Sequence, residues 1–118
     1  MRRIMLKSKI HNAVVTETEL LYSGSITIDE LIMEKSDVIE NERVQVVNLN
    51  NGARLETYVI KGKKGAGNVC LNGPAARLGT PGDTIHILSY ATVSEDELKG
   101  FKTKIIVLNE KNEVIQEK

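Results

Sequence analysis

The chain has 118 residues, 41% of them hydrophobic, and its 16 Lys and Arg are balanced by 16 Asp and Glu. This length is enough for one compact core and too short for two, so we expect a single domain over residues 1–118. The balanced charge argues against nucleic acid or an acidic membrane as the partner, and it favours a small molecule.

The N-terminus and the cysteine content indicate the compartment. Lys7 interrupts the first apolar run before a signal peptide could form, so we expect a soluble protein of the cytoplasm. Cys70 is the single cysteine, which excludes an internal disulfide and a cysteine-rich zinc site. We interpret it as a buried strand thiol. His86 has no second ligand at metal-binding spacing, so we assign it to the barrel and predict no metal site.

Short runs of alternating or continuous apolar residues recur along the chain and predict β-strands. They cover residues 5–10, 13–16, 25–28, 44–49, 55–60, 69–71, 84–91 and 104–108. Many short strands in one small domain indicate a closed barrel, whose topology the periodicity leaves open.

Helical signals are few, and each predicted helix has only two or three turns. Asp29 can cap a helix over residues 30–35, Pro74 can open one that Gly79 closes, and Ser94 forms a capping-box pattern with Glu97.

Two connections carry turn signals. Residues 50–52, Asn-Asn-Gly, predict a hairpin whose returning strand sets Arg54 and Tyr58 on one face and Thr57 on the other. Residues 61–67 are rich in lysine and glycine but lack the order of a phosphate-binding loop, so we interpret them as a mobile basic hairpin loop.

The dipeptide Gly24-Ser25 could cleave its own peptide bond, which most loop dipeptides cannot do. A serine hydroxyl can attack the carbonyl of the preceding residue, and glycine leaves that carbonyl open to attack because it has no Cβ. Gly-Ser alone is also an ordinary turn, so the surrounding residues decide between these readings.

Those surroundings contain several further motifs: Lys9-Ile10-His11, Tyr22, the segment NGARLETY at residues 51–58 and the segment LNGPAAR at residues 71–77. In order and approximate spacing, the chain resembles the pyruvoyl-dependent aspartate 1-decarboxylases from Met1 to about Ile115. It departs from that family at Pro74, where many relatives have alanine, and at Asn12, where a basic residue is usual.

The resemblance implies a mainly β fold, a six-stranded double-psi β-barrel with a few short helices, in a homotetramer with active sites between subunits. It implies self-cleavage between Gly24 and Ser25 into residues 1–24 (the β chain) and residues 25–118 (the α chain). Ser25 would become a covalent pyruvoyl group at the start of the longer chain. Whether cleavage is spontaneous or assisted by another protein stays open.

The implied reaction is decarboxylation of L-aspartate at its α-carboxylate, through an imine with the pyruvoyl group, to β-alanine and carbon dioxide. The product would serve the synthesis of pantothenate and coenzyme A. An electrophilic carbonyl suits this chemistry because no ordinary side chain can absorb the electron pair left on Cα, and no motif points to pyridoxal phosphate.

By resemblance, Tyr58 is the proton donor, although a strand tyrosine could simply pack. Arg54 and Lys9 would hold the substrate carboxylates, and which holds which stays open; either could instead be a solvated surface cation. Substrate contacts are implied for Thr57, Gly73, Pro74 and Ala75, and supporting roles for His11, Tyr22 and Asn72. Pro74 has no N–H, which puts any contact through that amide in doubt.

Two other functions compete with this one. The first is an uncleaved double-psi barrel that acts as a binding or assembly module, which has no need of Ser25, Arg54 and Tyr58 together. The second is a pyruvoyl-dependent decarboxylase of another amino acid, which Arg54 disfavours because it suits a second carboxylate.

Overall fold

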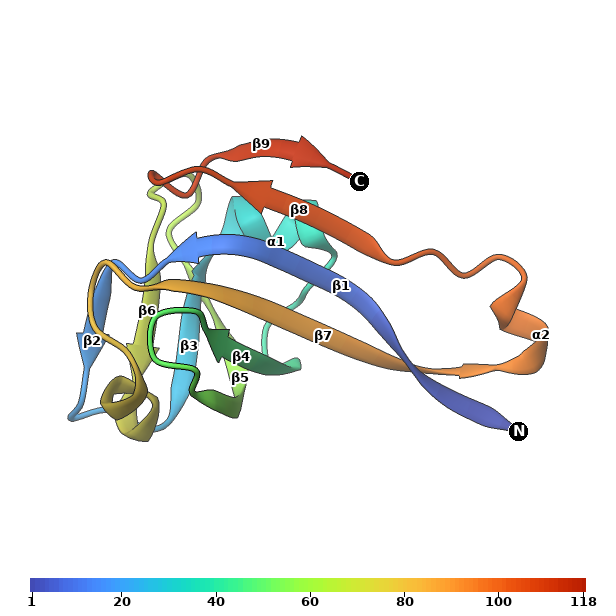
Figure 1. Ribbon diagram of the computed structural model, residues 1–118, viewed down its shortest axis with the longest axis horizontal. Helices are drawn as coiled ribbons and strands as arrows, with labels where there is room; N and C mark the ends of the chain where they lie inside the picture. Colours follow the sequence, from blue (N-terminus) through green and yellow to red (C-terminus); the bar gives the residue numbers. More distant parts are fainter.

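The computed structural model describes residues 1–118 and is mainly β with three short helices, as the sequence predicted (Figure 1). Its strands are β1 (Arg2–Val14), β2 (Glu17–Glu19), β3 (Ser25–Asp29), β4 (Arg43–Asn48), β5 (Arg54–Gly62), β6 (Val69–Asn72), β7 (Thr84–Ser94), β8 (Lys104–Leu108) and β9 (Val114–Glu117). The helices are α1 (Glu30–Ser36), the 3-10 helix η1 (Gly73–Leu78) and α2 (Glu95–Leu98).

The nine strands form one hydrogen-bonded sheet in the order β2-β6-β3-β5-β4-β7-β1-β8-β9. The pairs β3–β5, β1–β8 and β2–β6 are parallel and the others are antiparallel. Parallel pairs set among antiparallel neighbours agree with the expected double-psi barrel. The strand count exceeds the expected six, and the short strands β2 and β9 form the two edges of the ladder.

Side chains bring distant parts of this curled sheet together. The Asn112 amide nitrogen donates to the carbonyls of Val14 (2.9 Å) and Gly67 (2.8 Å), and its oxygen accepts from the Val14 N–H at 2.7 Å. Thr16 similarly bonds both the N–H and the carbonyl of Val69. These contacts join the end of β1, the start of β6 and the β8–β9 turn, where the strand ladder itself has no pairing.

Several strand predictions need correction. The two strands expected over residues 5–10 and 13–16 form one long strand, because a bulge at Asn12, with φ of 65°, lets the chain continue. Strands β2 and β9 carried no periodic signal and were missed. Residues 61–67 do not form a hairpin loop, because β3 lies between β5 and β6 in the sheet.

That loop is also held in place rather than free. Gly65 and Gly67 donate their N–H groups to the Asp29 carboxylate, each at 2.8 Å, and the same carboxylate accepts from Leu31 N at the start of α1. Asp29 therefore caps α1, as predicted, and anchors the loop as well. The capping box of Ser94 with Glu97 is confirmed, and Pro74 opens a 3-10 helix that ends before Gly79.

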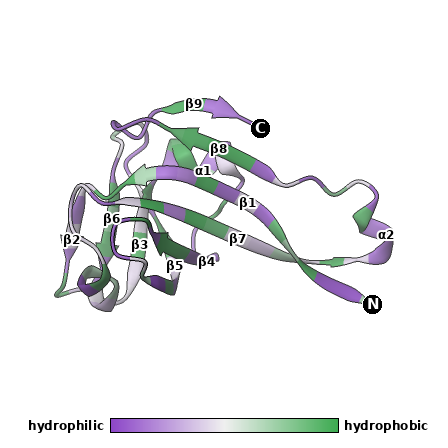
Figure 2. Ribbon diagram, in the orientation of Figure 1, coloured by the Kyte–Doolittle hydropathy of each residue, from purple (hydrophilic) through white to green (hydrophobic).

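The core is built by strict alternation along the strands. Isoleucines and valines that point inward are at most 1% exposed; among them are Ile10, Ile26, Ile28, Val44, Val46, Val59, Ile85, Ile87 and Ile106. Figure 2 shows hydrophobic residues along the strands of the barrel and hydrophilic residues at the N-terminus and the end of β9. The inward face is filled by apolar side chains, so polar side chains gather on the outward face.

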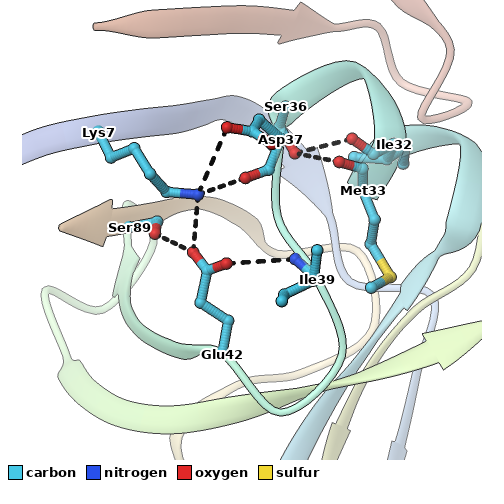
Figure 3. Close-up of polar contacts among 8 residues, drawn as sticks. All are labelled: Lys7, Ile32, Met33, Ser36, Asp37, Ile39, Glu42 and Ser89. Atoms are coloured by element: carbon cyan, nitrogen blue, oxygen red, sulfur yellow. Dashed lines mark hydrogen bonds and ion pairs between the residues drawn. The ribbon is translucent and has the colours of Figure 1, made fainter. Parts of the chain in front are cut away.

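Strands β1 and β7 run together beyond the barrel as a long ribbon that ends near α2 (Figure 1). Where the ribbon leaves the barrel, Lys7 Nζ lies 3.0 Å from Glu42 Oε2 and donates to the carbonyl of Asp37 (Figure 3). Glu42 also accepts from the Ser89 hydroxyl and, at 3.2 Å, from Ile39 N. This partly buried network ties β1 and β7 to the connection between α1 and β4.

None of the helices has the length and hydrophobicity needed to span a lipid bilayer.

Candidate active site

The Gly24-Ser25 bond lies where an exposed loop enters the sheet. Leu21 is 92% exposed and Tyr22 is 51% exposed, whereas Ser25, the first residue of β3, is fully buried. The Ser25 hydroxyl has a single weak acceptor, the carbonyl of Ser23 at 3.5 Å. A buried hydroxyl thus directly follows an exposed segment.

Asn72 holds the Ser25 hydroxyl from the neighbouring strand. Ser25 and Asn72 are register partners in the antiparallel pair β3–β6, and Asn72 is 4% exposed. The Asn72 amide nitrogen lies 2.9 Å from Ser25 Oγ. The side chain predicted as supporting therefore contacts the oxygen that would attack.

Gly73 allows the loop of residues 22–24 to lie directly against η1. Its φ is +64°, and a Cβ at this position would lie 2.5 Å from the Tyr22 carbonyl oxygen, 2.8 Å from Gly24 N and 2.9 Å from Gly24 Cα. All three are backbone atoms, which cannot turn aside as the end of a side chain can. Only glycine fits this cradle, which sets the backbone of residues 22–24 next to Ser25.

A cavity of about 210 Å³ opens beside Gly24. Thr57, Pro74 and Ala75 contribute to its wall, together with Leu55, Glu56 and Leu78. Pro74 lies next to Gly24, since a Cβ built on that glycine would come within 3.5 Å of the proline ring. The structure thus brings together three of the residues for which substrate contacts were predicted.

Strand β5 divides its functional residues between two faces, as predicted. Leu55, Thr57 and Val59 point inward, and Arg54 and Tyr58 point outward. Ile26 pairs with Val59 in the parallel ladder, so Ser25 and Tyr58, each one residue earlier, lie side by side on the same face. Tyr58 is 38% exposed and is therefore available to a ligand over Ser25.

Arg54 lies further along the same outward face, close to Gln45 and Tyr90. Its guanidinium donates to Gln45 Oε1 at 3.2 Å, and the Tyr90 hydroxyl donates to the same oxygen at 3.1 Å. Sequence reasoning missed Gln45 and Tyr90, because no local signal shows that these strands set them beside Arg54. Gln45 holds the guanidinium without neutralising it.

Lys9 and His11 lie on β1, which β7, β4 and β5 separate from β3 in the sheet. No strand pairing joins β1 to β3 or β6, and no hydrogen bond within the chain joins Lys9 or His11 to Ser25 or Asn72. Both residues point outward, on the face that also carries Arg54 and Tyr58.

His11 stacks on His86 with ring centroids 4.1 Å apart. Burial, with a smaller contribution from the charge of Lys9, lowers the pKa of His11. Burial also lowers the pKa of His86 to about 4, with contributions from His11 and Lys9. His86 Nδ1 accepts the N–H of Asn12 at 3.1 Å, so neutral His86 supports the bulge beside His11. This contact uses only the backbone of Asn12, so the departure from the usual basic residue does not affect it.

Comparison with known proteins finds the same family by a family model and by individual relatives. The family model for aspartate decarboxylase matches residues 1–115. The chain is 57% identical to an aspartate 1-decarboxylase of Halalkalibacterium halodurans over 98% of this chain and 91% of that protein. It is 52% identical to one from Thermoanaerobacter pseudethanolicus over 98% of both chains. It is 58% identical to one from Acetivibrio thermocellus over 94% of this chain and 88% of that protein.

Proposed function

The chain belongs to the aspartate decarboxylase family, and we propose that it converts L-aspartate to β-alanine and carbon dioxide with a pyruvoyl group made from its own Ser25. The observation that carries this proposal is the setting of the Gly24-Ser25 bond. The hydroxyl is buried and bonded to Asn72, and the loop before it rests on a glycine that no other residue can replace without displacing backbone.

These residues fit self-cleavage. Ser25 Oγ would attack the Gly24 carbonyl carbon, the peptide C–N bond would break, and the hydroxyl proton would pass to the Ser25 nitrogen to leave an ester. Loss of the Ser25 Cα proton and cleavage of its Cβ–Oγ bond then release the Gly24 carboxylate. One water molecule hydrolyses the resulting enamine to the ketone and ammonia. The products are residues 1–24 and residues 25–118.

A pyruvoyl carbonyl at position 25 would supply the electron sink for the pair that remains on Cα when the α-carboxylate leaves. Tyr58 lies beside position 25 on the same face and is exposed, which suits it to return a proton to the substrate Cα. Thr57, Pro74 and Ala75 line the cavity at the cleavage point and would enclose the substrate.

Arg54 presents a planar fork that binds a carboxylate bidentately. We assign it to the carboxylate that aspartate retains, because a strong hold on the departing one would stabilise the ground state and slow the reaction. Gln45 keeps the Arg54 guanidinium in place. The guanidinium has no carboxylate partner, because the neighbouring Glu56 pairs with Arg43.

Lys9 and His11 would reach the substrate from a neighbouring subunit, in a homotetramer with sites between subunits. In support, no contact within one chain joins either residue to Ser25, and the chain exposes large apolar side chains. Among them are Leu20, Leu21, Tyr22, Leu49, Leu78 and Tyr90. The proposal places the enzyme in the cytoplasm, where its free thiol stays reduced, and its product would supply pantothenate and coenzyme A synthesis.

Mass spectrometry under denaturing conditions tests the proposal. The purified chain should separate into residues 1–24 and residues 25–118, the latter blocked to Edman degradation and active on aspartate. Ser25→Ala should stay whole and inactive. A chain that stays intact, even after incubation with cell extract, would instead favour an uncleaved binding module.

A further inference from the structure

Asn72 is held by two side chains that the mechanism above does not use. The Cys70 thiol donates to Asn72 Oδ1 at 3.1 Å, and the Thr27 hydroxyl lies 2.9 Å from Asn72 Nδ2. Cys70, Asn72, Ser25 and Thr27 all lie on the outward face of the adjacent strands β3 and β6. Cys70 is 6% exposed and Asn72 is 4% exposed, so water does not compete freely for these groups.

The Asn72 amide has a donor end and an acceptor end, so its orientation determines whether Ser25 Oγ meets an N–H donor or a carbonyl oxygen. In the observed orientation, the two N–H groups of Asn72 meet the oxygens of Ser25 and Thr27, and its carbonyl oxygen meets a thiol donor. If the amide turned over, its N–H groups would face sulfur, which is a weak acceptor. Burial, with the charges of Glu17 and Glu19, raises the pKa of Cys70 to about 11, which keeps the thiol protonated and able to donate.

We propose that Cys70 and Thr27 are positioning residues for self-cleavage: together they hold the Asn72 amide with its N–H directed at Ser25 Oγ. The inference rests on the proposed self-cleavage. In the ester, Ser25 Oγ is the oxygen that leaves with the Gly24 carboxylate as the Cβ–Oγ bond breaks. A donor at that oxygen stabilises the negative charge that develops on it, so a correctly oriented amide speeds the elimination.

Two matched pairs of variants separate positioning from packing. Thr27→Val keeps the shape and loses the hydroxyl, whereas Thr27→Ser keeps the hydroxyl and loses a methyl group that packs against Gly62. Cys70→Ala removes the donor, and Cys70→Ser replaces it with a hydroxyl. Positioning predicts that the two serine variants cleave faster than Thr27→Val and Cys70→Ala, and packing predicts the reverse order at residue 27.

Cleavage rates are measured by mass spectrometry, with thermal unfolding of each variant as the check on folding. Thr27→Val and Cys70→Ala should cleave about three- to tenfold more slowly than the unmodified chain, the rate equivalent of one neutral hydrogen bond. The serine variants should restore most of that rate. If Cys70→Ala does not fold, the pair at residue 27 decides.

Two further readouts would not respond to a merely structural role. The slowed variants should accumulate the ester, which neutral hydroxylamine cuts at Gly24 to free Ser25 as an N-terminus. In an Asn72→Ala background, the changes at Cys70 and Thr27 should have no further effect.

Normal rates in Thr27→Val and Cys70→Ala, slow cleavage without ester, or undiminished effects in the Asn72→Ala background would each overturn the inference. An unmodified chain that fails to cleave would instead overturn the proposed function.

Discussion

Gly73→Ala tests whether the glycine cradle determines the position of the scissile bond. The new Cβ would lie 2.5 Å from the Tyr22 carbonyl oxygen, against about 3.4 Å for an ordinary contact, so the two must separate by about 0.9 Å. The residue would also keep a φ of +64°, which costs a residue other than glycine about 1–2 kcal/mol.

This displacement moves the Gly24 carbonyl relative to Ser25 Oγ. A misplacement of about 1 Å between reacting groups can reduce a rate by about a hundredfold, so we expect cleavage to slow by about that factor. The total destabilisation should be about 1–3 kcal/mol, which leaves the chain folded.

The assay follows formation of residues 25–118 by mass spectrometry, beside a thermal unfolding curve. Gly52→Ala is the matched control, because Gly52 also has positive φ, +74°, but no atom lies within 4 Å of its added Cβ. It should lose similar stability and cleave at the normal rate. If Gly73→Ala cleaves as fast as Gly52→Ala, the cradle does not position the bond and the reasoning fails.

Three other predictions concern turnover, stability and pH. Tyr58→Phe should fold and cleave normally yet form β-alanine far more slowly; near-normal turnover in the cleaved variant would remove Tyr58 as proton donor. Glu42→Ala should lower the free energy of unfolding by about 1.5–3 kcal/mol, because it removes the nearer carboxylate of the partly buried Lys7 and leaves only the exposed Asp37, 4.0 Å away. Glu117→Gln, in an exposed pair with Lys35, should cost at most about 1 kcal/mol, and equal losses by denaturant unfolding would contradict this. Since the pKa of His86 falls from 6.5 to about 4 on folding, the unfolded chain binds more protons between those values, so stability should rise with increasing pH across that window and be lost as the pH is lowered from 6.5 to about 4. His86→Gln should flatten this dependence, and an unchanged slope would refute the assignment.

Local signals in the sequence predicted the elements well where neighbouring residues determine them. Asp29 caps α1, and Ser94 and Glu97 form their capping box, because each needs only backbone within a few residues. The alternation along β5 also put Arg54 and Tyr58 on the face opposite to Thr57. Such rules do not depend on how the strands are ordered.

Features that depend on strand order could not be predicted in this way. The second role of Asp29, as anchor of residues 65–67, and the bridge made by Asn112 both join segments far apart in sequence. The edge strands β2 and β9 are short and mostly exposed, so they have no apolar period to reveal them. Family resemblance indicated the site residues, and only the fold showed that β1, which carries Lys9 and His11, pairs with neither β3 nor β6.

The positions of the candidate site residues separate the proposed self-cleavage from the proposed turnover of substrate. Gly24, Ser25, Asn72 and Gly73 meet within one chain, so the self-cleavage that we propose should need no neighbouring subunit. Thr57, Pro74 and Ala75 line the cavity beside Gly24, whereas Lys9 lines no part of that cavity and has no contact with Ser25 within the chain.

Assembly should therefore control turnover more strongly than maturation. On dilution below the concentration at which subunits dissociate, turnover per chain should fall, while the first-order rate constant for cleavage at Gly24-Ser25 should stay the same. Sedimentation measured on the same samples gives the fraction assembled. If cleavage slows in parallel with dissociation, a neighbouring subunit supplies part of the cleavage machinery, and His11, which no contact within the chain brings to Ser25, becomes the first residue to test in that role.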